Sequence, residues 1–155
     1  MVLDQIDALQ LEYLRALDRR DMAAWERCFG ETASYVCTTA ESEDQGLPVA
    51  LMLDDSRQRI ADRVGYVTKI WAGTFEDYRT RHFVQRLSCS ARPGPRLDVE
   101  SQFLVAYTTT RGQSELLATG VYRDEIVIDS AGARFASKKA VLDTAITPRY
   151  LVYPI

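Results

Sequence analysis

The residues that could do chemistry are few, and a single histidine limits them most. His82 is the only histidine in 155 residues, and Cys28, Cys37 and Cys89 show no C-x-x-C spacing. A non-haem iron facial triad needs two histidines and a carboxylate, and a Rieske cluster needs two histidines and two cysteines. This chain therefore cannot supply either iron centre by itself.

Three side chains form the set that a metal-free enzyme would use. Histidine can act as a general acid or base when a carboxylate orients it, so His82 could work with Asp18, and Tyr35 could add a hydroxyl. Spacing in sequence does not show that the three meet in space, so the alternative interpretations are a stand-alone isomerase or dehydratase, and a small-ligand-binding or assembly module with no linked oxygenase. We favour a structural His82, hydrogen-bonded at a sheet edge or a subunit contact beside Arg79 and Arg81.

Two carboxylates lie among apolar residues of predicted strands. An unpaired buried charge is costly, so Asp124 and Asp143 should be paired or solvated. The cations considered as partners are Arg63, Arg123, Lys138 and Lys139. We therefore interpret Asp124 and Asp143, together with Arg81 and His82, as structural or interface residues.

Composition and charge indicate one globular domain covering residues 1–155. The chain is 46% hydrophobic and 26% charged, and its net charge is -3 with both signs interspersed. No basic stripe indicates a nucleic-acid or membrane partner, and no apolar run reaches the roughly 18 residues of a membrane span. The N-terminus has no basic region of a signal peptide, and scattered cysteines are typical of a reducing compartment. We expect a cytoplasmic protein.

The first third of the chain is predicted to be helical. One apolar stripe recurs at helical spacing: Leu3, Ile6, Leu9, Tyr13, Leu14 and Leu17. Such a stripe indicates an amphipathic helix with one face to bury. Asp21 can cap a second, short helix that runs through Trp25 to Phe29. Gly30 then ends it, and residues 34–39, rich in β-branched and aromatic types, predict a strand.

A third helix is predicted after a polar surface loop at residues 40–47. Asp54, Asp55 and Ser56 offer capping oxygens at its start, and Gly73 stops it. Its apolar positions follow helical spacing: Ile60, Val64, Val67 and Trp71. Trp71, like Trp25, is therefore expected in the core.

The chain after Tyr78 is predicted to form long strands joined by tight turns. Residues 99–107 alternate with the period of two of a sheet that has one covered face. The predicted strands are residues 81–91, 97–110, 115–128 and 134–146. Helices followed by such a sheet give an α+β domain, with N-terminal helices on the concave face of a curved, mostly antiparallel sheet. This resembles the cone of nuclear-transport-factor-2-like (NTF2-like) proteins, a fold that hosts both enzymes and non-catalytic chains.

The order of short motifs resembles the small, or β, subunits of ring-hydroxylating non-haem iron dioxygenases. The matching segments are residues 13–25 with Asp18 and Asp21, residues 51–71 with Arg63-Val64, Arg79-Thr-Arg-His82, Gly120-Val-Tyr-Arg-Asp124 and Val141-Leu-Asp143. They span almost the whole chain. The compact length and the Gln45-Gly-Leu step are most similar to subunits of systems that act on single-ring aromatic acids, such as terephthalate or anthranilate.

The resemblance implies a structural subunit without catalytic, cofactor-binding or metal-binding residues. In such systems the large, α, subunit carries the Rieske [2Fe-2S] cluster and the non-haem Fe(II), and the complex dihydroxylates its aromatic substrate. The implied partner is that α subunit, with three copies of each chain.

The sequence also predicts self-association or a partner on the second face of the sheet. Apolar residues at even spacing could place apolar surface there: Leu104, Ala106, Leu116, Ala118 and Tyr122. The apolar tail, residues 150–155, should dock on its own sheet or on a neighbour. Together these surfaces exceed what a monomer usually exposes, which predicts an oligomer.

Overall fold

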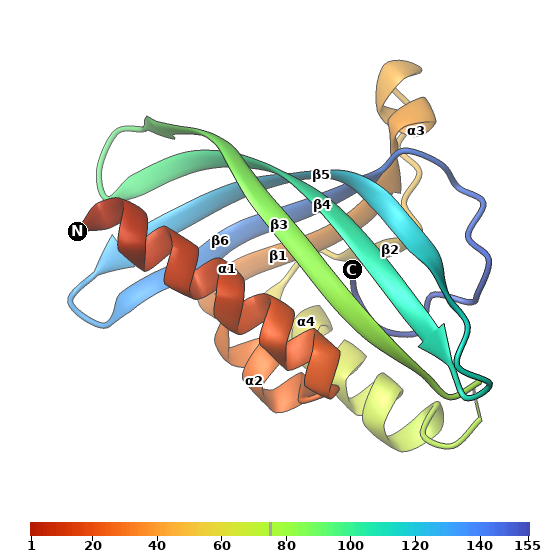
Figure 1. Ribbon diagram of the computed structural model, residues 1–155. Coiled ribbons are helices and arrows are strands. Elements are labelled where there is room, and N and C mark those ends of the chain that lie inside the picture. Colours follow the sequence, from red (N-terminus) through yellow and green to blue (C-terminus); the bar gives the residue numbers. More distant parts are fainter. Residues whose placement is uncertain (75) are drawn as a thin grey trace.

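A six-stranded sheet organises the chain (Figure 1). The computed structural model describes residues 1–74 and 76–155. The strands are β1 Phe29–Thr39, β2 Met52–Asp54, β3 Tyr78–Ala91, β4 Arg96–Thr109, β5 Ser114–Asp129 and β6 Gly132–Leu142. Their order is β2-β1-β6-β5-β4-β3, and neighbours are antiparallel except β1 and β6, which are parallel. The predicted α+β class with a mostly antiparallel sheet is confirmed.

Most of the helical residues gather on one side of the sheet, as Figure 1 shows. The helices there are α1 Val2–Arg19, α2 Met22–Arg27, α4 Arg57–Gly65 and the π-helix η1 Tyr66–Ile70. The short helix α3 Ala40–Asp44 stands apart from them. None of the helices in the described part of the chain has the length and apolar character that a bilayer crossing requires.

The apolar stripe of α1 packs against the sheet as predicted. Tyr13 and Leu17 are 0% and 2% exposed. Arg20 ends the helix in the left-handed conformation with φ 57°. Asp21 then accepts a hydrogen bond from the Ala24 backbone N–H at 2.9 Å, so the predicted cap of the second helix is confirmed.

Two predicted boundaries in the first third are wrong. Strand β1 begins at Phe29, so Phe29 and Gly30 belong to the strand and not to the end of the second helix. Pairing begins this early because Phe29 already lies opposite Phe135 of β6. The predicted loop at residues 40–47 contains helix α3, whose first turn is capped when Thr39 Oγ1 accepts a hydrogen bond from Ser42 N–H at 3.2 Å.

Trp71 was expected in the core and is 38% exposed. The α-helix stops at Gly65 and continues as a π-helical turn, in which the Trp71 N–H donates to the Tyr66 carbonyl at 3.1 Å. This wider winding rotates Trp71 away from the side on which Val67 is buried. Trp25 is 0% exposed, as predicted.

A β-bulge at Leu117 decides which apolar residues of β5 face the helices. The β4–β5 register shifts by one residue at this point. Ala118 and Tyr122 consequently lie on the helix-covered face and are 6% and 1% exposed, whereas Leu116 is 55% exposed. The expectation that Ala118 and Tyr122 add apolar surface to the outer face is wrong, and Leu116 is the β5 residue that does so.

An ion pair lies in the core. Lys138 Nζ is 2.9 Å from Asp124 Oδ2, and the two side chains are 1% and 0% exposed. Nζ also lies 3.7 Å from the ring centroid of Tyr122 and 4.5 Å from those of Tyr13 and Phe135. Burial raises the pKa of Asp124 and lowers the pKa of Lys138, and their mutual attraction opposes both shifts. Asp124 is thus paired within the chain. Its partner is Lys138, one of the four cations that the sequence analysis considered.

Gly120→Ala is expected to destabilise the protein strongly. Gly120 of β5 lies so close to β6 that an added Cβ would be 2.0 Å from the Val141 carbonyl oxygen and 2.9 Å from Phe103 Cζ. Only separation of the strands relieves this overlap, so urea denaturation should show a loss of about 3 kcal/mol or more.

Gly65→Ala is the matched control. A Cβ at this helical position meets nothing within 4 Å. The substitution should therefore raise the free energy of unfolding by about 0.5–1 kcal/mol. Equal stability of the two variants would contradict the packing described at Gly120.

Candidate functional site

Asp18, near the end of α1, is bound by three groups of β3. Its Oδ1 accepts hydrogen bonds from Thr80 Oγ1 at 3.0 Å and from His82 Nδ1 at 2.6 Å, and its Oδ2 accepts from the His82 backbone N–H at 3.2 Å. A carboxylate acceptor assigns the ring proton to Nδ1. The structure therefore brings together two of the three residues of the enzyme alternative, although they lie 64 positions apart.

These contacts occupy part of the free edge of the sheet, at the start of β3. β3 is an edge strand, and such a strand presents unpaired N–H and C=O groups that can recruit other chains. Besides the bond to the His82 N–H, the Arg20 guanidinium donates to the Tyr78 carbonyl, and Arg81 donates to the Thr80 carbonyl at 2.9 Å. His82 and Arg81 thus both belong to the closure of this edge.

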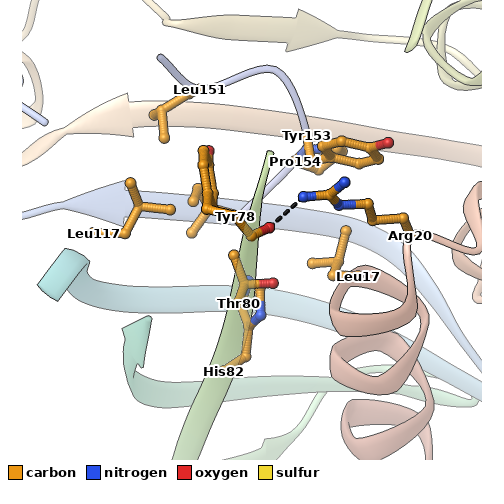
Figure 2. A pocket seen from close by; sticks show the side chains of 10 residues that line it. Leu17, Arg20, Tyr78, Thr80, His82, Leu117, Leu151, Tyr153 and Pro154 are labelled. Atoms are coloured by element: carbon orange, nitrogen blue, oxygen red, sulfur yellow. Dashed lines mark hydrogen bonds between the residues drawn. The ribbon is translucent and has the colours of Figure 1, made fainter. Parts of the chain in front are cut away.

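A small cavity lies beside the Asp18–His82 pair (Figure 2). Its apolar and aromatic lining is Leu17, Leu117, Leu151, Ile155 and the rings of Tyr78 and Tyr153. His82 also lines it, with a side chain only 3% exposed, and within the described residues its Nε2 has no hydrogen-bond partner. The cavity volume is about 20 Å³, which is room for one water molecule.

The size of this cavity limits what the pair can do. Oriented by a carboxylate, His82 has the geometry of a proton-transfer group. Ligand pockets, however, usually measure roughly 300–1,000 Å³. A substrate with an aromatic ring does not fit beside His82 in this conformation.

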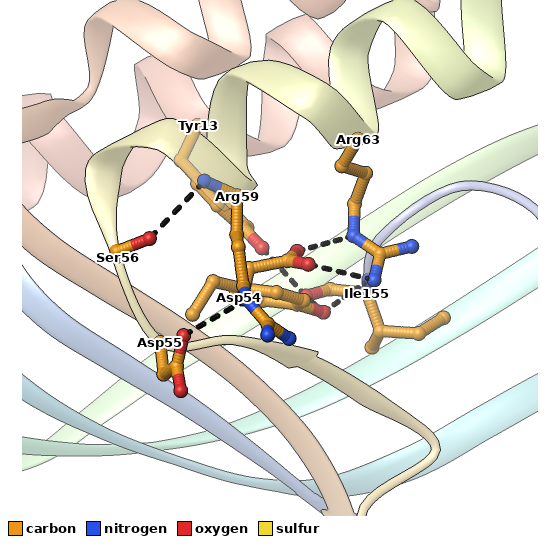
Figure 3. A network of polar contacts seen from close by, with 8 residues as sticks. Tyr13, Asp54, Asp55, Ser56, Arg59, Arg63 and Ile155 are labelled. Atoms are coloured by element: carbon orange, nitrogen blue, oxygen red, sulfur yellow. Dashed lines mark hydrogen bonds and ion pairs between the residues drawn. The ribbon is translucent and has the colours of Figure 1, made fainter.

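Tyr35, the third residue of the enzyme alternative, has a different role. Its buried hydroxyl donates to the Ile155 carbonyl at 3.2 Å and accepts from the Ile155 N–H at 2.9 Å. The Tyr13 hydroxyl donates to the same carbonyl at 2.6 Å (Figure 3). Burial raises the pKa of Tyr13 and of Tyr35 well above the usual tyrosine value, so both remain protonated donors. Tyr35 holds the C-terminal segment, residues 150–155, in place.

The C-terminal segment docks on its own chain. Ile155 is 2% exposed and lies between α1 and β1, whose tyrosines bind it. Tyr150 at the other end is 90% exposed. The sequence left open whether this segment docks on its own sheet or a neighbour, and its apolar composition was the signal that it docks at all.

An ion pair ties α4 to β2 next to this segment (Figure 3). Arg63 donates to Asp54 through Nε and through Nη2, the latter at 3.0 Å. Of the three capping candidates, Ser56 caps the helix by accepting from the Arg59 N–H at 3.3 Å. Asp55 instead pairs with the Arg59 side chain at 3.2 Å. The Asp54 carboxylate therefore positions the helix on the sheet.

The remaining candidates form no reactive centre. Asp143 is exposed and accepts a hydrogen bond from Thr119 Oγ1 at 2.7 Å, in contrast to the buried Asp124. Burial raises the pKa of the Cys28 and Cys37 thiols to about 12, so neither is a thiolate near neutral pH. Within residues 1–74 and 76–155, no group of three His, Cys, Asp or Glu side chains is arranged to hold a metal ion.

Asp18→Asn is expected to lower the free energy of unfolding by about 1–3 kcal/mol. The amide loses the charge-assisted hydrogen bond to His82, and its NH₂ group would face one of the donors of β3 that the carboxylate now accepts from. Urea denaturation measures this loss, and hydrogen exchange at the His82 amide should become faster. Asp4→Asn is the control, since its side chain is 75% exposed and pairs with the N-terminal amine. Equal stability of the two variants would show that Asp18 does not hold α1 to β3.

Comparison with known proteins places this fold in a family. The model of the family "Ring hydroxylating beta subunit" matches residues 14–149. The chain is 30% identical over 151 residues to the anthranilate 1,2-dioxygenase small subunit of Burkholderia cepacia, covering 97% of this chain and 92% of that one. It is 24% identical to the terephthalate 1,2-dioxygenase terminal oxygenase component subunit beta 2 of Comamonas sp, with 97% of each chain covered.

A solved structure agrees with the family match and with the two relatives. The β subunit assigned to an aromatic-ring-hydroxylating dioxygenase of Novosphingobium aromaticivorans superposes with a TM-score of 0.86 at 26% identity, covering 98% of this chain and 95% of that one. The predicted NTF2-like cone is thereby confirmed. Because the family match covers most of the chain, this protein belongs to the ring-hydroxylating β subunit family, the small subunits of aromatic-ring-hydroxylating dioxygenases.

Proposed function

We propose that this small subunit is an assembly component whose partner contains the catalytic centre. The relatives are components of multi-subunit dioxygenases, so the chain works with a large α subunit. The cavity beside His82 carries the proposal, because about 20 Å³ leaves no room for an aromatic substrate. In this proposal the α subunit holds the Rieske [2Fe-2S] cluster and the non-haem Fe(II), since the ligand set of this chain fits neither centre.

The proposed reaction is dihydroxylation of a single-ring aromatic acid. The named relatives belong to dioxygenases of anthranilate and terephthalate, which are both such acids. Both atoms of dioxygen would join the ring, with two electrons and two protons, to give a cis-dihydrodiol or, after loss of a substituent, a catechol. The small subunit would support this chemistry by holding the large subunits in their working assembly.

Exposed apolar side chains on the outer face of the sheet support a partner there. Phe83 is 60% exposed, Leu87 51% and Leu116 55%. Ile146 and Tyr150, which follow β6 in the chain, are 84% and 90% exposed. Large exposed apolar side chains in one region are typical of subunit contacts. We propose an assembly of three small and three large subunits, with contacts between small subunits as well.

We also propose that residues 1–155 form one domain of a cytoplasmic protein. Buried side chains from Ile6 to Ile155 belong to one core cluster, which supports a single domain. Cys28, Cys37 and Cys89 are free thiols, which supports a reducing compartment.

A stand-alone isomerase or dehydratase is the second candidate. The observation in its favour is the Asp18–His82 pair with Nε2 unoccupied. It would require the C-terminal segment to leave the cavity and Tyr35 to release Ile155. The family match favours the assembly role over this candidate.

Co-expression with the large subunit tests the assembly role. The large subunit is recognised as a neighbouring reading frame with C-x-H and C-x-x-H motifs. The two chains should purify together in equal amounts, with iron only in fractions that contain the large subunit. Stoichiometric iron in the isolated small chain, or a dilution-resistant monomer that ignores the large subunit in light scattering, would contradict the proposal.

His82→Ala should leave the turnover of each assembled complex within a few-fold of the wild type, because His82 acts through the sheet edge. Gln58→Ala, an exposed position on helix α4, is the control for handling and assembly. The measurement is turnover divided by the amount of assembled complex. A loss of roughly 10²–10⁴-fold with assembly intact would assign proton transfer to His82 instead.

A further inference from the structure

A row of exposed apolar side chains follows the short helix α3. Every second residue from position 47 to position 53 belongs to this apolar row: Leu47, Val49, Leu51 and Leu53. These residues are 46–58% exposed, whereas Met52 and Asp54, which alternate with the last two, are each 5% exposed. Residues two positions apart in an extended segment point to the same side. The apolar row is therefore one stripe of the surface.

Backbone hydrogen bonds hold this row in its outward position. Thr38 Oγ1 donates to the Val49 carbonyl at 2.8 Å, and the Leu51 N–H donates to the Cys37 carbonyl at 2.7 Å. Leu53 lies in β2, which pairs with β1. Contiguous apolar side chains that a fixed backbone keeps in water are typical of a contact with another chain.

A groove of about 630 Å³ opens beside the row. Leu51 lies on one side, and the chain after β6 forms the other side, where Ile146 and Tyr150 are 84% and 90% exposed. Two charged side chains also line it, and they neutralise each other because Arg149 Nε is 3.2 Å from Glu76 Oε2. The groove thus offers apolar surface on both sides without a net charge, which suits an extended apolar segment.

The two ends of the apolar row differ in charge. Helix α3 lies at one end and the start of α4 at the other (Figure 1). Glu41 and Asp44 of α3 are exposed, and no cation among the described residues forms an ion pair with either. At the start of α4, Asp55 already pairs with Arg59 at 3.2 Å. The row therefore has one acidic end and one neutral end.

This asymmetry favours a different chain over a second copy of this one. A second copy related by a two-fold axis would run antiparallel along the row. Its neutral Asp55–Arg59 end would then meet the acidic end of the first copy, and Glu41 and Asp44 would still lack a cation. A partner that brings its own cation to this end has the complementary charge.

We propose that the apolar row and its groove bind an extended apolar segment of the large subunit, which places a Lys or Arg side chain beside Glu41 and Asp44. The inference rests on the proposed assembly role and adds to it a surface of this chain and the chemistry of the segment that binds there.

A competition experiment in the complex tests the row. Wild-type and variant small chains with different tags are co-expressed with the large subunit, and their shares in the purified complex are compared. Val49→Lys places an ammonium group in the apolar contact, so its share should fall by about tenfold or more. Leu11→Lys is the matched control, because Leu11 is 48% exposed on α1, and its share should equal that of the wild type.

A charge reversal tests the acidic end. Asp44→Lys should reduce the share of the variant severalfold at low salt, and the effect should shrink in about 1 M NaCl, which screens charge pairs. Glu31→Lys, a charge reversal at an exposed position of β1, is the control and should compete like the wild type. An unchanged share for Asp44→Lys would overturn the recognition of a cation at α3.

The outcomes separate this inference from the assembly role. A wild-type small chain that does not assemble with the large subunit would contradict the assembly role itself. Assembly of the wild type with equal shares for Val49→Lys and Leu11→Lys would overturn only the inference about the row.

Light scattering of the isolated small chain examines the other occupant. If Val49→Lys abolishes self-association but keeps its share in the complex, the row binds a second copy and the proposal is wrong. Near-UV circular dichroism confirms the fold of each variant, and Leu53→Lys replaces Val49→Lys if the latter does not fold.

Discussion

The carboxylate of Asp18 is the contact on which the rest of the structure depends. It joins α1 to the edge strand β3 through Thr80, the His82 ring and the His82 backbone at once. This attachment fixes α1 across the sheet, and α1 in turn presents Tyr13 to Ile155. One side chain thereby binds the start of the edge strand, orients the only histidine and indirectly sets the wall of the cavity. A histidine in such a position stabilises structure and still retains one free ring nitrogen.

The spacing of apolar residues predicted well which helices and strands form. It predicted less well which face of an element each side chain lies on. The stripe of α1 and the long strands followed from spacing, because burial of one face repeats over many residues. The π-turn that turns Trp71 outward and the bulge at Leu117 each shift the phase by a single residue, which an average over a window does not reveal. The meeting of Tyr35 with Ile155 was unpredictable for another reason, since it joins positions 120 apart through one hydroxyl.

The buried Asp124–Lys138 pair shows how chemistry in the core can specify a register. The two residues are direct cross-strand partners of β5 and β6. A slip of β6 by one residue would turn Lys138 to the outer face and leave Asp124 and the rings of Tyr13 and Tyr122 without their cation. The cost of desolvating both charges offsets much of their attraction, so the pair adds little net stability. Its clearer effect is to disfavour other registers of β5 with β6. The sequence indicated that Asp124 needed a partner but not which cation supplied it.

The parallel pairing of β1 with β6 determines when the fold can be completed. Pairs such as Val36 with Lys139 join positions about a hundred residues apart, which makes this ladder slow to form. A ribosome releases β6 only after β3, β4 and β5 have been made, so β1 waits with one side unpaired during synthesis. Closure of the sheet is therefore a late event in the life of the nascent chain. An exposed β1 edge during that interval is the point at which misassembly with other chains would begin.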